Sequence, residues 1–192
     1  MTASVFDSIH KVISSYIEIS DKEWDYYSAM FGVKEFKRKE FVLDAGDICR
    51  NVYFVNSGLL RVFFNDKEGN ENTFHFTQEN NFVTDYESFL KKSPANFSIQ
   101  ALEDTRVVVM SYEMLHDGYD KLRHGEKLGR RIAEDYFFLF SNKIKSIYTE
   151  SPLERYQNMN KEFPGILARV PQHYIASYLN ISSVHLSRLK NS

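Results

Sequence analysis

The residues best suited to chemistry in this chain lie near its C-terminus, in the stretch VPQHYIASYLNISSVHLSRLK, residues 170–190. Arg188 can donate two parallel hydrogen bonds to one guanine edge. Asn180 separates two apolar-patterned segments, and Asn tolerates the left-handed conformation of a tight turn. The pattern predicts a helix-turn-helix, the motif that places its second helix in the major groove of double-stranded DNA.

The remaining positions of this stretch fit the same motif. Ile175 and Leu179 fall on the inner face of a first helix that Pro171 can begin, and Leu186 lies on the inner face of the second. Ser182 can cap the second helix. Ala176 is small where the two helices must cross closely. Ile181 can fill the corner between the helices, and Leu189 lies with the inner face of the second helix. The outer face of the second helix can contact base edges, and residues around it can bind phosphates. The predicted DNA-binding residues are Gln172, Ser182, Ser183, Val184, His185, Ser187, Arg188 and Lys190. The alternative is a helical hairpin that packs on the rest of the protein and contacts no nucleic acid.

Charge and composition agree with a DNA-binding end. Residues 151–192 carry five Lys and Arg against two Glu, a net charge of +3, whereas residues 1–150 carry 19 basic and 24 acidic residues, a net charge of −5. No apolar run approaches the roughly 18 residues of a membrane helix, and the N-terminus lacks the features of a secretory signal. Cys49 is the sole cysteine, which excludes a disulfide framework. We expect a cytoplasmic protein with no membrane contact.

The elements that must position these residues follow from periodicity. Residues 4–17 have apolar positions at helical spacing, and Ser20 with Glu23 forms a capping-box pattern that opens a second short helix. From about residue 34 to 110 the chain shows many short β-branched and aromatic runs at near-regular spacing, which predicts a sandwich or barrel. Residues 67–70, KEGN, form a hairpin turn with its glycine in place.

Helical periodicity returns after Ser111. An apolar stripe runs along a long segment from Tyr112 or Leu122 to Tyr148, and Ser151-Pro152 ends it. The members of the stripe are Leu122, Leu128, Ile132, Tyr136, Leu139, Phe140, Ile144 and Ile147. The stripe is broad enough to cover the sandwich on one side and a second copy on the other. A helix that packs only on its own domain is the alternative.

This layout resembles the Crp–Fnr family of bacterial transcription regulators over essentially the full chain. The stretches FVLDAGD, VYFVNSGLLRVFF and ALEDTRVVVMS look like its cyclic-nucleotide-binding-type jelly roll, with Gly46 and Gly58 at turns, and residues 169–190 look like its DNA-binding end. The resemblance implies an α+β chain in three parts: a sensor jelly roll with two N-terminal helices (residues 1–111), a long dimerisation helix (112–150) and a helix-turn-helix domain (151–192). It also implies a homodimer, paired along the long helix on a two-fold symmetric DNA site.

The sensor departs from the family's pattern for binding cyclic nucleotides. In nucleotide-binding members, the phosphate-binding cassette opens with Gly-Glu and closes with Arg-Ser/Thr-Ala. Here Thr84-Asp85 stands at the first motif and Ala95-Asn96-Phe97 at the second, so the Arg is missing. Losing a charge-assisted bond to a buried phosphate costs a few kcal/mol. We therefore expect an effector other than cyclic AMP, or none, with Thr84, Asp85, Asn96 and Phe97 as candidate pocket residues. Lys91 or Lys92 could replace the Arg, although adjacent lysines in a polar turn are usually solvated.

Other functions have less support from the residues. An iron–sulfur sensor needs several cysteines, and the single strand histidine, His75, suits packing better than haem ligation. A metal-dependent cupin would need a His-x-His, and there is no phosphate loop, Gly-x-Ser-x-Gly motif or paired catalytic carboxylate. We therefore expect no catalytic residues, metal site or cofactor. The stronger rival to a DNA-binding regulator is a degenerate sensor whose terminal helices dock a protein partner.

Overall fold

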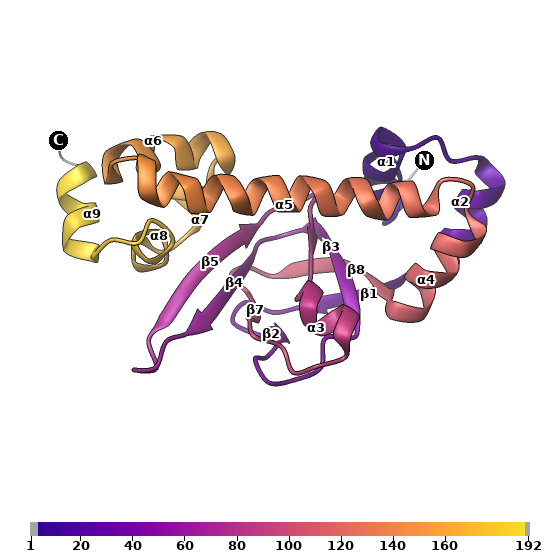
Figure 1. The fold of residues 1–192 in the computed structure, drawn as a ribbon, viewed down its shortest axis with the longest axis horizontal. Helices are drawn as coiled ribbons and strands as arrows, with labels where there is room; N and C mark the ends of the chain where they lie inside the picture. Colours follow the sequence, from indigo (N-terminus) through magenta and orange to yellow (C-terminus); the bar gives the residue numbers. More distant parts are fainter. Residues whose placement is uncertain (1–3, 191–192) are drawn as a thin grey trace.

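A computed structural model describes residues 4–190 of the chain, and Figure 1 shows its arrangement. The N-terminal part contains α1 (Asp7–Tyr16), α2 (Asp21–Ser28), β1 (Gly32–Phe36), β2 (Phe41–Leu43), β3 (Asn51–Ser57), β4 (Leu60–Asn65), β5 (Glu71–Thr77), β6 (Phe82–Val83), α3 (Tyr86–Lys91), β7 (Ser98–Ala101) and β8 (Thr105–Ser111). The helices α4 (Tyr112–Lys121), α5 (Gly125–Thr149), α6 (Pro152–Glu162), α7 (Ile166–Arg169), α8 (Gln172–Tyr178) and α9 (Ser183–Lys190) follow. Together they confirm the predicted α+β jelly-roll class with a long helix after the strands.

The strands form two four-stranded antiparallel sheets within residues 4–190, in the orders β1-β8-β3-β6 and β2-β7-β4-β5. Alternate apolar side chains of both sheets, such as Val55, Leu60, Ile99 and Val107, fill the space between them. The predicted hairpin turn joins β4 to β5, and Gly69 adopts a positive φ of 83° there. β5 is the outer strand of its sheet, so its free backbone edge faces the helices that follow in sequence.

The long helix α5 crosses the sandwich, with α1, α2 and α4 near one of its ends and α6–α9 at the other (Figure 1). Its N-terminal half packs with α1 and α4 around a second core that includes Ile13, Met114 and Leu128. The predicted long helical segment consists of α4 and α5, which meet at a sharp bend. A side chain at Gly125 would lie 2.0 Å from the Gly118 carbonyl oxygen, so the two helices can meet this closely because residue 125 is a glycine.

The terminal helices share a third core with the sandwich. Leu59, Phe76 and Leu102 from the sandwich pack against apolar side chains of α6–α9, among them Phe163 and Leu179. These helices therefore do not form a core separate from the sensor. Within residues 4–190, no helix combines the length and the apolar composition that crossing a lipid bilayer requires.

Candidate DNA-binding helices and sensor cavity

Helices α8 and α9 lie where the sequence predicts the two helices of a helix-turn-helix. Pro171 occupies the N-cap of α8, and Asn180 adopts a left-handed φ of 54° in the turn. The Ser182 hydroxyl accepts a hydrogen bond from the His185 amide at 3.2 Å, which caps α9. Ile175, Ala176, Leu179 and Leu186 are buried on the inner side, and Ile181 and Leu189 are half-buried.

The opposite face of α9 is open to solvent. Val184 is 63% exposed, and Ser183, His185, Ser187, Arg188 and Lys190 are exposed as well, as are Ser182 in the turn and Gln172 at the start of α8. The structure thus places all eight predicted DNA-binding residues on the surface. Among the ion pairs of residues 4–190, none involves Arg188 or Lys190, so their positive charges are available to a partner.

Helix α8 is held against the free edge of β5. The amide of Thr73 donates to the Ser177 hydroxyl at 2.8 Å, and this hydroxyl contacts the Glu71 carbonyl oxygen at 3.3 Å. The fully buried guanidinium of Arg61 on β4 lies 3.8 Å from the ring centre of Tyr174 on α8, within cation–π range. Backbone and side-chain contacts therefore join the first helix of the motif to the sensor sheet.

Arg169, at the end of α7, forms the strongest polar link between the terminal helices and the sandwich. Its guanidinium donates to the carboxylates of Glu79 and Glu103 at 2.7–3.0 Å and to the Gly58 carbonyl oxygen at 3.1 Å. Two charge-assisted pairs on one guanidinium are individually worth more than neutral hydrogen bonds. In the sequence Arg169 is one of the five positive charges of residues 151–192, and no local pattern points to its partners on the sandwich.

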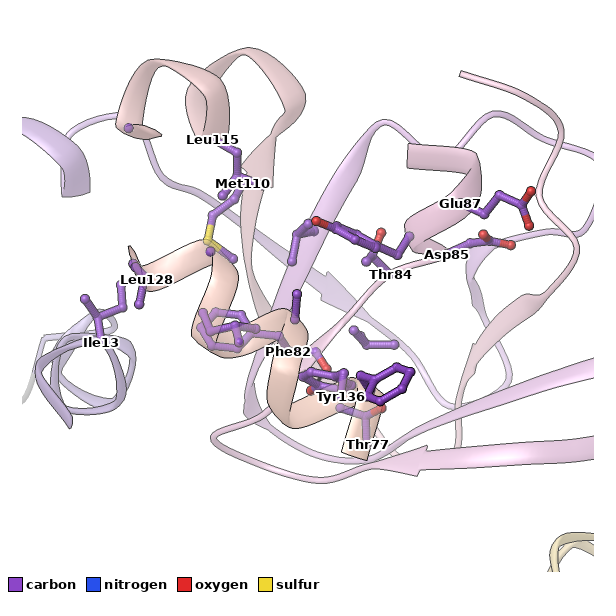
Figure 2. A pocket seen from close by; sticks show the side chains of 18 of the residues that line it. Ile13, Thr77, Phe82, Thr84, Asp85, Glu87, Met110, Leu115, Leu128 and Tyr136 are labelled. Carbon is purple, nitrogen blue, oxygen red and sulfur yellow. The ribbon is translucent and has the colours of Figure 1, made fainter. Parts of the chain in front are cut away.

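A cavity of about 590 Å³ separates the sandwich from α5, and apolar side chains supply most of its lining. Phe82, Val83 and Met110 contribute from the sheets, and Leu128 and Tyr136 from α5. Figure 2 shows these helix side chains facing strand residues such as Thr77, with Asp85 and Glu87 near α3. Its size lies in the range of small-molecule sites.

The strand β5 is irregular where it meets the cavity. Val62 of β4 pairs with His75, whereas the next residue, Phe63, pairs with Thr73, so Phe74 is an extra residue on β5. This is a β-bulge, which redirects side chains. As a result, the adjacent residues Phe74 and His75 both line the cavity, as does Thr77.

Two polar atoms beside the cavity have no hydrogen-bond partner within the described part of the chain. They are Nδ1 of His75 and Oγ1 of Thr77, whose residues are 5% and 1% exposed. Burial and, to a lesser extent, the nearby cation of Lys143 together lower the pKa of His75 to about 3. His75 is therefore a neutral imidazole at pH 7, with one ring nitrogen able to accept a hydrogen bond and the other able to donate one.

Lys143 links the bulge to the terminal helices. The half-buried ammonium group donates to the Phe74 carbonyl oxygen and lies 3.5 Å from the ring centre of Tyr178 on α8. Burial lowers the pKa of Lys143 to about 7, and the negative charge of Glu162 partly opposes this shift. One side chain of α5 thus touches both the sensor strand and the first helix of the motif.

The predicted effector residues come together around Asp85. This carboxylate, 2% exposed, accepts hydrogen bonds from the amides of Ser88 at 3.0 Å, Asn96 at 2.8 Å and Phe97 at 3.2 Å. Thr84, Asp85 and Phe97 line the cavity, whereas Asn96 contributes its amide to Asp85 and is not part of the lining.

The two lysines considered as substitutes for the missing Arg do not line this cavity. Lys91 pairs with Glu87 at 2.7 Å on the surface, and Lys92 lies over the Tyr112 ring. Among the residues that the structure describes, no cluster of three or more His, Cys, Asp or Glu side chains is arranged to hold a metal ion.

Comparison with known proteins agrees with this architecture. Residues 33–121 match the family described as cyclic nucleotide-binding domain. A search of curated protein sequences finds no match. Solved structures similar to this chain include FixK2 from Bradyrhizobium japonicum, with 14% identity, a TM-score of 0.72 and coverage of 84% of this chain and 83% of FixK2. The chain has the fold of the Crp–Fnr regulators.

Two further neighbours cover a larger share of this chain. The c-di-GMP responsive global regulator CLP of Xanthomonas campestris is 13% identical, with a TM-score of 0.69 and 90% of both chains covered. A protein from Eubacterium rectale, named as a transcriptional regulator of the Crp/Fnr family, is 16% identical, with a TM-score of 0.69 and coverage of 92% and 86%. At these identities the likeness concerns the fold alone. The resemblance stated from the sequence is confirmed at that level.

Proposed function

We propose that this protein is a homodimeric transcription regulator that binds double-stranded DNA through α9. The observation that carries the proposal is the exposed face of α9, a helix capped by Ser182, because Arg188 and Lys190 form no ion pair with any other residue of the range 4–190. In this proposal Ser183, Val184 and Arg188 contact base edges. The other five predicted residues contact phosphates or line the groove.

The proposed division of labour follows the three parts predicted from the sequence. Residues 1–111 form the sensor, 112–150 the connecting and dimerisation segment, and 151–192 the DNA-binding unit. The unpartnered apolar side of α5 supports dimerisation: Phe137 is 66%, Ile144 54% and Tyr148 85% exposed, and they recur at helical spacing along one stripe. A second copy packed on this stripe would place two α9 helices for a two-fold symmetric site.

The geometry of Asp85 supports a sensor that does not use cyclic AMP. By the resemblance stated from the sequence, Asn96 and Phe97 correspond to part of the family's Arg-Ser/Thr-Ala segment, and here their amides already donate to the carboxylate of Asp85. A phosphate at this position would face a buried negative charge instead of an Arg. Like charges in a buried site cost several kcal/mol, so the proposal excludes a cyclic nucleotide held in the usual way.

A selection of genomic DNA fragments with purified protein tests the proposal, at about 150 mM salt to suppress non-specific binding. We expect enrichment of a two-fold symmetric site with half-sites about one helical turn apart. Arg188→Ala should weaken binding to that site about tenfold or more. Arg38→Ala is the matched control, because Arg38 is an equally exposed arginine in the sensor part. No enrichment, or equal effects of the two variants, would favour terminal helices that dock a protein partner.

Dimerisation needs a separate test. Ile144→Glu places a charge in the apolar stripe of α5 and should convert the dimer to a monomer in light-scattering measurements. It should also weaken binding to a two-half-site probe more than to a single half-site. Asn142→Glu adds the same charge at an exposed polar position of α5 and should leave the dimer intact.

A further inference from the structure

The cavity beneath α5 has the chemistry of a specific small-molecule site. None of the described residues that line it is a Lys or Arg, and its walls are mostly aromatic and aliphatic. Of the two carboxylates that line it, Asp85 already accepts three amide hydrogen bonds and Glu87 pairs with Lys91 at the surface. A charged ligand would therefore lose its hydration without gaining a free counter-charge, at a cost of several kcal/mol. The cavity favours a neutral, apolar molecule.

The two unpartnered polar atoms of β5 indicate that a ligand of this cavity carries one polar group. Buried polar groups are nearly always hydrogen-bonded, and those that are not need a reason. Nδ1 of His75 and Oγ1 of Thr77 belong to residues that are more than nine-tenths buried, line the same cavity and project from the same strand, two residues apart. Residues two apart on a strand lie on one face, so one ligand group can reach both.

From these observations we infer that the cavity binds a neutral, largely apolar molecule, whose single hydroxyl or aromatic amine group hydrogen-bonds with His75 and Thr77. This inference deepens the proposed regulatory function by naming the ligand class of its sensor. The polar group of the ligand would lie next to the β5 bulge. In this bulge the Phe74 carbonyl oxygen accepts a hydrogen bond from Lys143 of α5. Lys143 in turn contacts Tyr178 of α8, so the ligand site and the DNA-binding helices share one side chain.

Two probes of matched size test the ligand class: 1-naphthol, which has a hydroxyl group, and 1-methylnaphthalene, which has none. Both fluoresce, and their binding to the full-length protein can be titrated without DNA. We expect both to bind, at one per chain, and 3′,5′-cyclic AMP not to compete. Thr77→Val keeps the side-chain shape and should weaken 1-naphthol about three- to tenfold while changing 1-methylnaphthalene less than twofold.

Two further variants complete the design. His75→Phe should show the same selective loss for 1-naphthol, which covers the case in which Thr77→Val folds poorly. Ala133→Leu fills the cavity from α5 and should remove both probes, whereas Asn142→Glu on the same helix should remove neither. A thermal melt of each variant confirms folding.

The outcomes separate this inference from the proposed function. Failure of both probes to bind, equal weakening of both by Thr77→Val and His75→Phe, or displacement of the probes by cyclic AMP would each overturn the ligand class. None of these results bears on DNA binding, which the fragment selection measures without ligand. Conversely, selective probe binding by a protein that enriches no DNA would leave the ligand site established and remove the regulatory role.

Discussion

The buried imidazole of His75 predicts a specific loss of stability in acid. In the folded chain its pKa is about 3 because of burial, whereas an unfolded histidine has a pKa of about 6.5. Between these values the unfolded chain binds a proton that the folded chain does not, so the free energy of unfolding falls as the pH falls. From pH 7 to pH 5, the linkage relation gives a loss of about 2 kcal/mol from this one group.

Urea unfolding at pH 7 and pH 5 measures this loss, at one fixed protein concentration because the stability of the proposed dimer would depend on that concentration. His75→Gln removes the titrating group and should lose about 2 kcal/mol less than the wild type over the same interval. Glu162, whose pKa is raised by burial, titrates in the opposite sense, and the comparison of the two proteins cancels its contribution. His173→Gln, at an exposed histidine, should behave like the wild type. Equal losses in the wild type and in His75→Gln would refute the reasoning.

Four further substitutions test other contacts. Gly58→Ala should destabilise the fold by about 2 kcal/mol or more, measured by urea unfolding, because φ is 99° and the new Cβ would lie 2.4 Å from the Thr105 hydroxyl. Asp85→Ala leaves three amides unpaired and should cost about 3 kcal/mol or more in the same assay. Arg169→Met leaves two glutamates without their arginine partner. Relative to the wild type, amide hydrogen exchange in α8 should become faster, whereas exchange in α1 should change less. Lys143→Met should abolish a gain of stability between pH 7 and pH 9, since the wild-type lysine is neutral when folded and charged when unfolded.

The fold could be predicted from the sequence because each element carries its own local signal. The capping box at Ser20, the glycine of the β4–β5 turn and the left-handed Asn180 all behave as their residue types predict. The break between α4 and α5 was less visible. It depends on the absence of a side chain at Gly125 next to the carbonyl of residue 118, and an isolated glycine in an apolar-patterned segment does not reveal what it touches.

The candidate DNA-binding residues could be predicted from the sequence, but the cavity residues His75 and Thr77 could not, because only the former follow from a local pattern. The eight candidate DNA-binding residues follow from helical spacing within about twenty positions, which is a local pattern. The cavity anchors do not, because the bulge that turns His75 inward depends on its pairing with Val62. Arg61 carried a partial signal as a charge inside the apolar run LLRVFF, but its partner Tyr174 is more than a hundred residues away in sequence.

The packing of α8 against the edge of β5 has a consequence for aggregation of the chain. An uncovered strand edge with flat apolar surroundings is a template for pairing with other chains. Here the Ser177 hydroxyl accepts a hydrogen bond from the Thr73 amide on this edge, and the terminal helices bury Phe76 and Leu102 beside it. A fragment ending at residue 150 would open that edge and that apolar surface together. We expect such a truncation to aggregate by strand addition, because the terminal helices would no longer cover this edge of the sandwich.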